Sequence, residues 1–101
     1  MAISNVEKEG NWIRVYDEKS KKISEMAGRN KEVMGIASDF FVVQEGNWIK
    51  TYDEKCKKIA EMSLGDKEVR NASGTTFTVK EGNWLKTYDE KCKKISEKPV
   101  R

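Results

Sequence analysis

One string of residues is written three times in this chain. It reads EGNWIRVYDEKSKKI at 9–23, EGNWIKTYDEKCKKI at 45–59 and EGNWLKTYDEKCKKI at 81–95. Successive copies are 36 residues apart, and the match extends beyond the string, since residues 41–62 and 77–98 are identical at 17 of 22 positions. A period of this length indicates a repeat architecture, in which each unit buries its apolar face against its neighbours.

Each repeat consists of β-forming runs separated by turn signals. In the second repeat the runs KEVMGIA, FFVVQ, NWIKTYD and KKIAEM follow one another. Their β-branched and aromatic residues favour strands, and the intervening Gly-Asn and Asp favour turns. The apolar residues do not show a helical period. We therefore predict an all-β protein of antiparallel four-stranded meanders, with three strands in the first repeat and four in each of the others.

The chain of 101 residues is expected to be a single domain of three repeats, at about 1–28, 29–64 and 65–101. The first expectation is a pseudo-threefold, β-prism-like monomer. The pattern F-x-V-x-x-G-N-W-I-x-x-Y-D-x-x-x-K-x-I also resembles a blade of a β-propeller, with Cys or Ser where such blades often carry Gly. That resemblance implies propeller-like blades closed by dimerisation, because propellers need about four to eight blades. Other all-β closures, such as a trefoil, stay open.

The alternation of side chains along a strand places a Trp, a cation and a Tyr of each repeat on one face. Only 37% of the residues are hydrophobic, so a stable core needs these large aromatic rings. We therefore predict that they are core and that the stem of the intervening Lys or Arg lies along them. The alternative is an exposed ladder that stacks sugar rings or bases. The predicted core residues are Trp12, Tyr16, Trp48, Tyr52, Trp84 and Tyr88.

Identical polar residues at equivalent positions are candidates for ligand binding. An Asn, a Lys or Arg, and an Asp recur in every repeat and could bond to the hydroxyls of a sugar. The same Asn and Asp are good turn formers, which is the competing interpretation. The candidate binding residues are Asn11, Arg14, Asp17, Asn47, Lys50, Asp53, Asn83, Lys86 and Asp89.

The residue inventory argues against catalysis. The chain has no His, so Cys–His catalysis and Cys/His zinc sites cannot be assembled. Its two cysteines, Cys56 and Cys92, lie at equivalent repeat positions, which a pseudo-symmetric fold holds too far apart for a disulfide. The DEK clusters lack the several carboxylates of a calcium loop. We expect no metal, no cofactor and no enzyme activity.

Charge and hydropathy limit the partners. The net charge is only +3, and Lys and Glu are interspersed, which argues against nucleic acid as a ligand. No run approaches the ~20 apolar residues of a membrane span, and the N-terminal residues do not resemble a signal peptide. We expect a cytoplasmic protein without a membrane partner.

Two functions remain. The first is a non-enzymatic binding module, lectin-like or peptide-binding, with up to three equivalent sites for a carbohydrate or protein ligand. The alternative is a structural, self-assembling repeat protein that completes its fold by oligomerisation, for example as a homodimer. The odd strand count and the open sheet edges favour this alternative.

Overall fold

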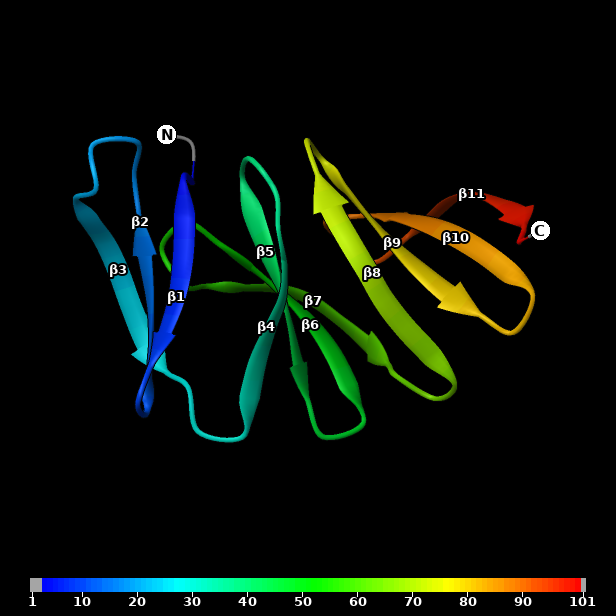
Figure 1. Ribbon diagram of the computed structural model, residues 1–101, viewed down its shortest axis with the longest axis horizontal. Helices are drawn as coiled ribbons and strands as arrows, with labels where there is room; N and C mark the ends of the chain where they lie inside the picture. Colours follow the sequence, from blue (N-terminus) through cyan, green and yellow to red (C-terminus); the bar gives the residue numbers. More distant parts are fainter. Residues whose placement is uncertain (1–2, 101) are drawn as a thin grey trace.

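The computed structural model describes residues 3–100, and throughout this range the regular structure is β. Eleven antiparallel strands are present there, in three separate sheets of three, four and four strands (Figure 1). The all-β prediction and the distribution of strands are confirmed. The strands are β1 (Asn5–Glu9), β2 (Trp12–Tyr16), β3 (Lys22–Ala27), β4 (Lys31–Ile36), β5 (Phe40–Glu45), β6 (Trp48–Asp53), β7 (Lys58–Ser63), β8 (Lys67–Ser73), β9 (Thr76–Glu81), β10 (Trp84–Asp89) and β11 (Lys94–Pro99).

Each repeated string builds a hairpin followed by a second tight turn. In the second sheet Glu45 pairs with Trp48 across a two-residue loop, and Gly46 at the first loop position has φ 60°. Positive φ at the first position, and not at the second, defines a type II′ turn, whose twist matches that of the flanking strands. The Gly-Asn of the repeat therefore fixes the register of its central hairpin.

The second turn depends on Asp. Oδ1 of Asp53 accepts backbone N–H groups from Lys55 at 2.8 Å and Lys57 at 2.9 Å. The turn leaves Cys56 with φ 62°, and Ser20 and Cys92 at the equivalent positions have φ 62° and 61°. This left-handed conformation favours Gly, so Ser20, Cys56 and Cys92 each hold a backbone conformation that costs an L-residue energy.

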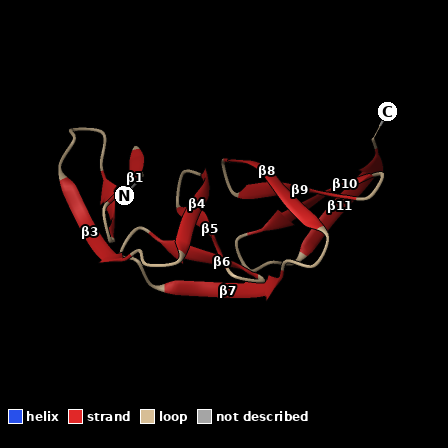
Figure 2. Cartoon of the chain, turned by 60° about the horizontal axis from the view of Figure 1, so that its bottom comes forward, coloured by secondary structure: helices blue, strands red, loops and turns tan. Residues whose placement is uncertain are grey.

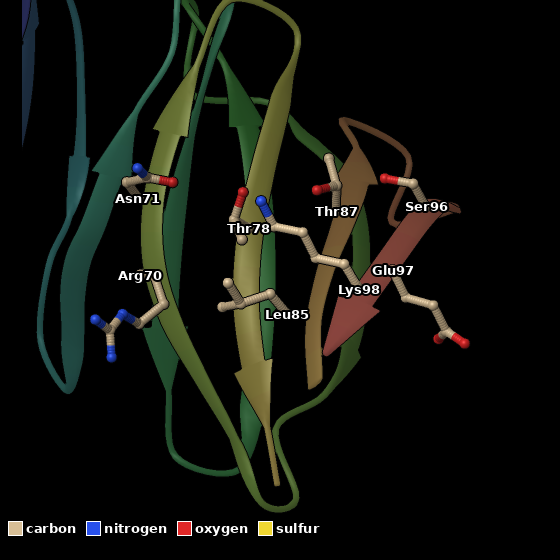
Figure 3. A pocket seen from close by; sticks show the side chains of 8 residues that line it. All are labelled: Arg70, Asn71, Thr78, Leu85, Thr87, Ser96, Glu97 and Lys98. Atoms are coloured by element: carbon tan, nitrogen blue, oxygen red, sulfur yellow. The ribbon is translucent and has the colours of Figure 1, made fainter. Parts of the chain in front are cut away.

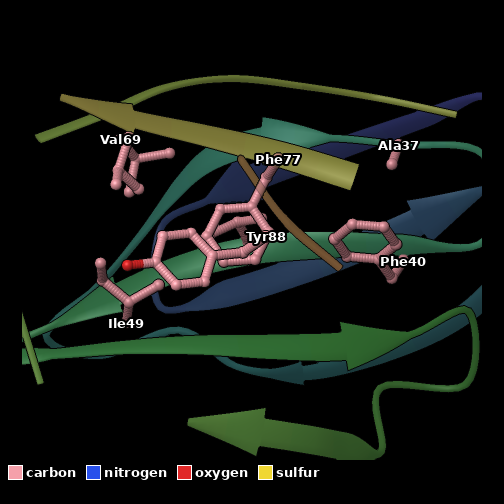
Figure 4. Close-up of a cluster of buried hydrophobic side chains, with 8 residues drawn as sticks. Ala37, Phe40, Ile49, Val69, Phe77 and Tyr88 are labelled. Carbon is pink, nitrogen blue, oxygen red and sulfur yellow. The ribbon is translucent and has the colours of Figure 1, made fainter. Parts of the chain in front are cut away.

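The three sheets follow one another along the longest axis of the molecule, with the second in the middle (Figure 1). One apolar cluster joins the first and second sheets through Ile13, Val15 and Phe41. Another joins the second and third through Phe40 and Phe77 (Figure 4). Within residues 3–100 both clusters lie between neighbouring sheets. Closure of the row as a prism or as a propeller stays a prediction, because it would require the outer faces of the first and third sheets to be covered.

The row of sheets is curved, and strands β1, β4 and β8 lie on its inner side. Strands β4 and β8 lie side by side, as do β1 and β4, whereas β3 and β7 lie on the opposite side of the row (Figure 2). Gly35 of β4 permits this approach, since a Cβ at that position would lie 3.0 Å from Cβ of Ala72 in β8. The sheets are therefore close at one edge and spread at the other.

A side-chain hydroxyl also links each pair of neighbouring sheets. Thr51 Oγ1 of the second sheet donates to the backbone carbonyl of Glu90 in the third, at 2.6 Å. Ser24 Oγ of the first sheet donates to the carbonyl of Glu54 in the second, also at 2.6 Å. Both acceptors lie in the Asp-capped turn, so this inter-sheet hydroxyl bond positions the turn of one sheet on its neighbour.

Both cysteines are free thiols in the part of the chain that the structure describes, as the repeat positions predicted. Cys56 packs against the cluster between the first and second sheets, and Cys92 packs against the other cluster. Burial raises the pKa of Cys92 to about 11 and also raises that of Cys56. These thiols therefore act as small packing groups.

Replacing Ser20 by Gly should raise the free energy of unfolding by about 0.5–1 kcal/mol. The left-handed backbone costs an L-residue roughly 1 kcal/mol, and Gly removes most of that cost. Urea denaturation followed by circular dichroism measures the change. The control is Ser63→Gly at an exposed strand position without positive φ, where a loss of about 0.5–1 kcal/mol is expected. Equal changes in the two variants would contradict the strain at position 20.

Thr51→Val should lower the free energy of unfolding by about 1–2 kcal/mol, because the carbonyl of Glu90 loses its buried donor. Ala60 occupies the position that Ser24 has in the first sheet, and it pairs with Thr51. Adding Ala60→Ser should therefore recover part of the loss. Equilibrium unfolding of both variants tests this, and an unchanged Thr51→Val protein would show that the bond does not hold the sheets together.

Candidate binding site at the repeated tryptophans

The tryptophans lie on the surface, and their assignment to the core was wrong. Trp12, Trp48 and Trp84 are 45%, 46% and 44% exposed. Tyr52 and Tyr88 are buried as predicted, and each stacks on a Phe ring of its own sheet at 5.6 Å between centroids. Tyr16 on the first sheet is only half-buried.

The physical reason is the geometry of packed, twisted sheets. Trp48, Lys50 and Tyr52 do share one face of β6, and burial increases along the strand from Trp48 to Tyr52. Twisted sheets that pack face to face diverge toward their corners. The Trp stands at the corner beside the hairpin turn, whereas the Tyr stands within the packed area.

The neighbouring sheet does not cover the indole. Trp48 has the first sheet in front of its face, and Trp12 lies on the outer face of the first sheet, yet their exposures are nearly equal. The equal exposures show that the cover of each ring comes from its own hairpin and not from a neighbouring sheet. The three rings therefore form three equivalent surface positions.

Each ring is flanked by an ion pair of the same repeat. Glu45 is the cross-strand partner of Trp48, and its Oε1 accepts a bond from Lys50 Nζ at 2.8 Å. The bond lowers the pKa of Glu45 and raises that of Lys50. The third repeat has the same pair between Lys86 and Glu81 at 2.7 Å.

The first repeat replaces the Lys by Arg. Arg14 bonds to Glu9 through Nη1 and to Glu25 through Nε, the latter at 3.3 Å. The carboxylate of Glu9 raises the pKa of Arg14 further. In all three repeats the cation beside the ring is thus largely neutralised by a carboxylate.

The candidate residues separate into two groups. The Asn residues are exposed in the turn directly before each Trp, and their backbone carbonyls accept the N–H of Gly28, Leu64 and Val100 at 2.6–2.8 Å. The Asp residues lie at the far end of the same strand, about 16 Å away for a rise of about 3.3 Å per residue. Asn11, Asn47 and Asn83 therefore lie near the rings, whereas Asp17, Asp53 and Asp89 do not.

The Asp side chains serve the second turn in all three repeats. Their Oδ1 atoms each accept two backbone N–H groups. The backbone N–H of Lys21 is the main cause of the lowered pKa of Asp17. These carboxylates are turn formers, and the surface beside the rings is built without them.

The sequence interpretation missed the glutamates Glu9, Glu45 and Glu81. Their signal was present, because a Glu three residues before a Trp, across Gly-Asn, faces that Trp in a two-residue hairpin. Each site therefore combines one half-exposed indole, one carboxylate, one cation and one Asn.

His, Cys, Asp and Glu side chains of residues 3–100 nowhere gather in a group of three or more that could hold a metal ion. The same residues contain no helix of the length and hydrophobicity that a membrane crossing needs. Comparison of the chain with family models, with curated proteins and with solved structures finds no match.

Trp48→Ala should cost only about 1–2 kcal/mol of unfolding free energy, because half of the ring already faces water. Tyr52→Ala should cost about 3–5 kcal/mol, because it empties a buried aromatic site. Chemical denaturation of both variants measures the difference. A loss at Trp48 as large as that at Tyr52 would show that the indole is a core residue after all.

Proposed function

We propose that the protein is a non-enzymatic binding module for carbohydrate, with three equivalent sites, one at each repeated Trp. The observation that carries the proposal is the equal, nearly half exposure of the three indoles, each with a paired cation and carboxylate beside it. A large ring left in water forgoes hydrophobic stabilisation of the fold. Its repetition in every hairpin is consistent with use of the ring as a platform.

The charges beside the ring favour an uncharged, hydroxyl-rich ligand. The cation is already paired with a carboxylate, as Lys50 is with Glu45. A nucleic acid backbone would meet that carboxylate, which repels phosphate. A sugar can instead place its C–H face on the indole and bond through its hydroxyls to the Glu, the Lys or Arg, and the exposed Asn.

The strand pairing disfavours a peptide ligand at the same place. A peptide that binds as an added strand needs unpaired backbone groups at a sheet edge. Trp48 lies in β6, which is paired on one side with Glu45 of β5 and on the other with Ser63 of β7. The strand that carries the indole is therefore already paired on both sides within the sheet.

Titration with neutral oligosaccharides, monitored by Trp fluorescence and calorimetry, tests the proposal. Three sites per chain are expected, and Trp48→Ala should reduce the stoichiometry to two. Binding to a polymeric glycan should fall more steeply, since three linked sites gain from avidity. The matched control is Lys57→Ala, an exposed residue of the second turn on the same sheet.

A glycan screen in which no sugar binds and the Trp emission stays unchanged would contradict the proposal. Binding that survives replacement of all three tryptophans would place the ligand elsewhere on the molecule. Loss of binding in Lys57→Ala would indicate a general effect on folding, which circular dichroism would detect.

A further inference from the structure

The two outer faces of the row are the remaining surfaces of interest. The tail face is the outer face of the third sheet, where a hollow of about 570 Å³ lies over Leu85 and Thr87 (Figure 3). The head face is the outer face of the first sheet, where Asn5, Glu7 and Tyr16 line a hollow of about 210 Å³. Both faces of the middle sheet, by contrast, are packed against a neighbouring sheet.

Comparison at 36-residue spacing shows how these faces differ from packed ones. On the tail face, Thr76 and Thr78 stand where the second sheet has the fully buried Phe40 and Val42. On the head face, Asn5 stands where the other sheets have Phe41 and Phe77. Both outer faces have thus exchanged core residues for polar ones, which keeps a terminal repeat soluble.

The exchanges at the two ends are complementary in charge. Glu7 of the head face occupies the place of Val79, which belongs to the cluster that also contains Met34 and Met62. Arg70 and Lys98 of the tail face occupy the places of those two methionines and line its hollow. The hollow is also lined by Glu97, whose carboxylate is already paired with Lys94 at 2.9 Å. Where the inside of the row has apolar side chains in one cluster, the head face has a carboxylate and the tail face has two cations.

The residues that hold neighbouring sheets together inside the chain have counterparts on the head and tail faces. Leu85 on the tail face is the counterpart of Ile49, and Tyr16 on the head face is the counterpart of Tyr88, two residues of one core cluster. These half-buried side chains provide an apolar centre for each face.

The donors and acceptor of the inter-sheet hydroxyl bond are also present. Thr87 and Ser96, at the positions of Thr51 and Ser24, line the tail hollow (Figure 3). The counterpart of the acceptor is the carbonyl of Glu18, in the head-face turn that Asp17 caps.

We propose that the tail face of one copy binds the head face of a second copy, and that two copies close a ring of six sheets through two such junctions. In each junction Glu7 lies between Arg70 and Lys98, Tyr16 contacts Leu85, and Thr87 or Ser96 donates to the carbonyl of Glu18. The junction repeats the packing that the chain already uses twice internally.

Charge selects this pairing over the other two arrangements. A head face on a head face would bring the two Glu7 carboxylates together, and a tail face on a tail face would bring Arg70 and Lys98 against their copies. Like charges in an interface are repelled, so opposite faces pair. Within residues 3–100, Arg70 pairs with Glu68 at 3.7 Å and Glu7 accepts a bond from Asn5 at 2.8 Å, and all four residues are exposed.

The shape of the chain favours closure over a filament. A junction between unlike faces gives a ring when its rotation closes and a filament when it does not. The row bends around β4 and β8, and its dimensions of 40 × 25 × 21 Å make the longest about twice the shortest, as in half of a disc (Figure 2). Two such halves complete a disc, and six sheets is a size that propellers adopt.

The junction leaves the tryptophans accessible. Trp12 on the head face is as exposed as Trp48, which already has a sheet in front of it. Ring closure is therefore independent of the proposed sugar sites, and each proposal can fail without the other.

Light scattering on a sizing column, with reductant, tests the ring at chain concentrations from about 1 µM to about 1 mM, where interfaces of modest affinity dissociate. The expected species has twice the 11.6 kDa mass of one chain. Glu7→Lys and the double variant Arg70→Glu/Lys98→Glu should each weaken association by at least about tenfold. Mixed in equal amounts, the two variants should form a dimer, because one junction is then native and the other has its charges swapped.

The control is Lys55→Glu, an exposed reversal in a turn of the middle sheet, which should leave the dimer intact. A monomer over the whole concentration range would overturn the proposal, and so would a mixture of the two variants that stays monomeric. Species larger than a dimer that depend on the same charges would overturn the closed ring. Circular dichroism of each variant separates loss of association from loss of folding.

Discussion

Strand β5 carries four consecutive buried apolar residues, from Phe40 to Val43, and two of them face each neighbouring sheet. A strand that is apolar on both faces is stable only between two covering layers. The first and third sheets supply those layers, and each fully buried Phe side chain contributes about 2–3 kcal/mol to the stack. Because β5 has apolar residues on both faces, the second sheet must lie between the other two, and the molecule is a row.

The same constraint explains the chemistry of the two ends. A sheet at the end of a row needs one apolar face and one face that water tolerates, and the repeats differ where this demand differs. Phe becomes Asn5 or Thr76 there, and Val becomes Glu7 or Thr78. The proposed ring uses these substitutions as a reversible version of the internal junction, in which charge replaces part of the apolar contact. The proposed sugar sites stand apart, at corners that sheet packing leaves uncovered.

Much of the fold could be predicted from the residues. The period, the β-forming runs and the turn residues are local signals, and the strand count of the first repeat follows from them. The common face of Trp48, Lys50 and Tyr52 was also predictable from alternation. Its burial was not, because the separation between two sheets varies along a strand. The distance of the candidate Asp residues from the rings was also not predicted, because a strand's length separates them from the Asn beside the rings.

The sequence by itself determined the three hairpins, because Gly-Asn and the Asp turn act over a few residues and set register wherever the hairpin lies. It also determined that the cysteines stay apart, since equivalent positions lie on different sheets. Only the tertiary structure decided which rings are covered. Tyr52 and Trp48 stand on the same strand face, yet the twist of packed sheets buries the first and leaves the second in water. Burial depends on the distance to another layer, and that distance is a property of the whole stack.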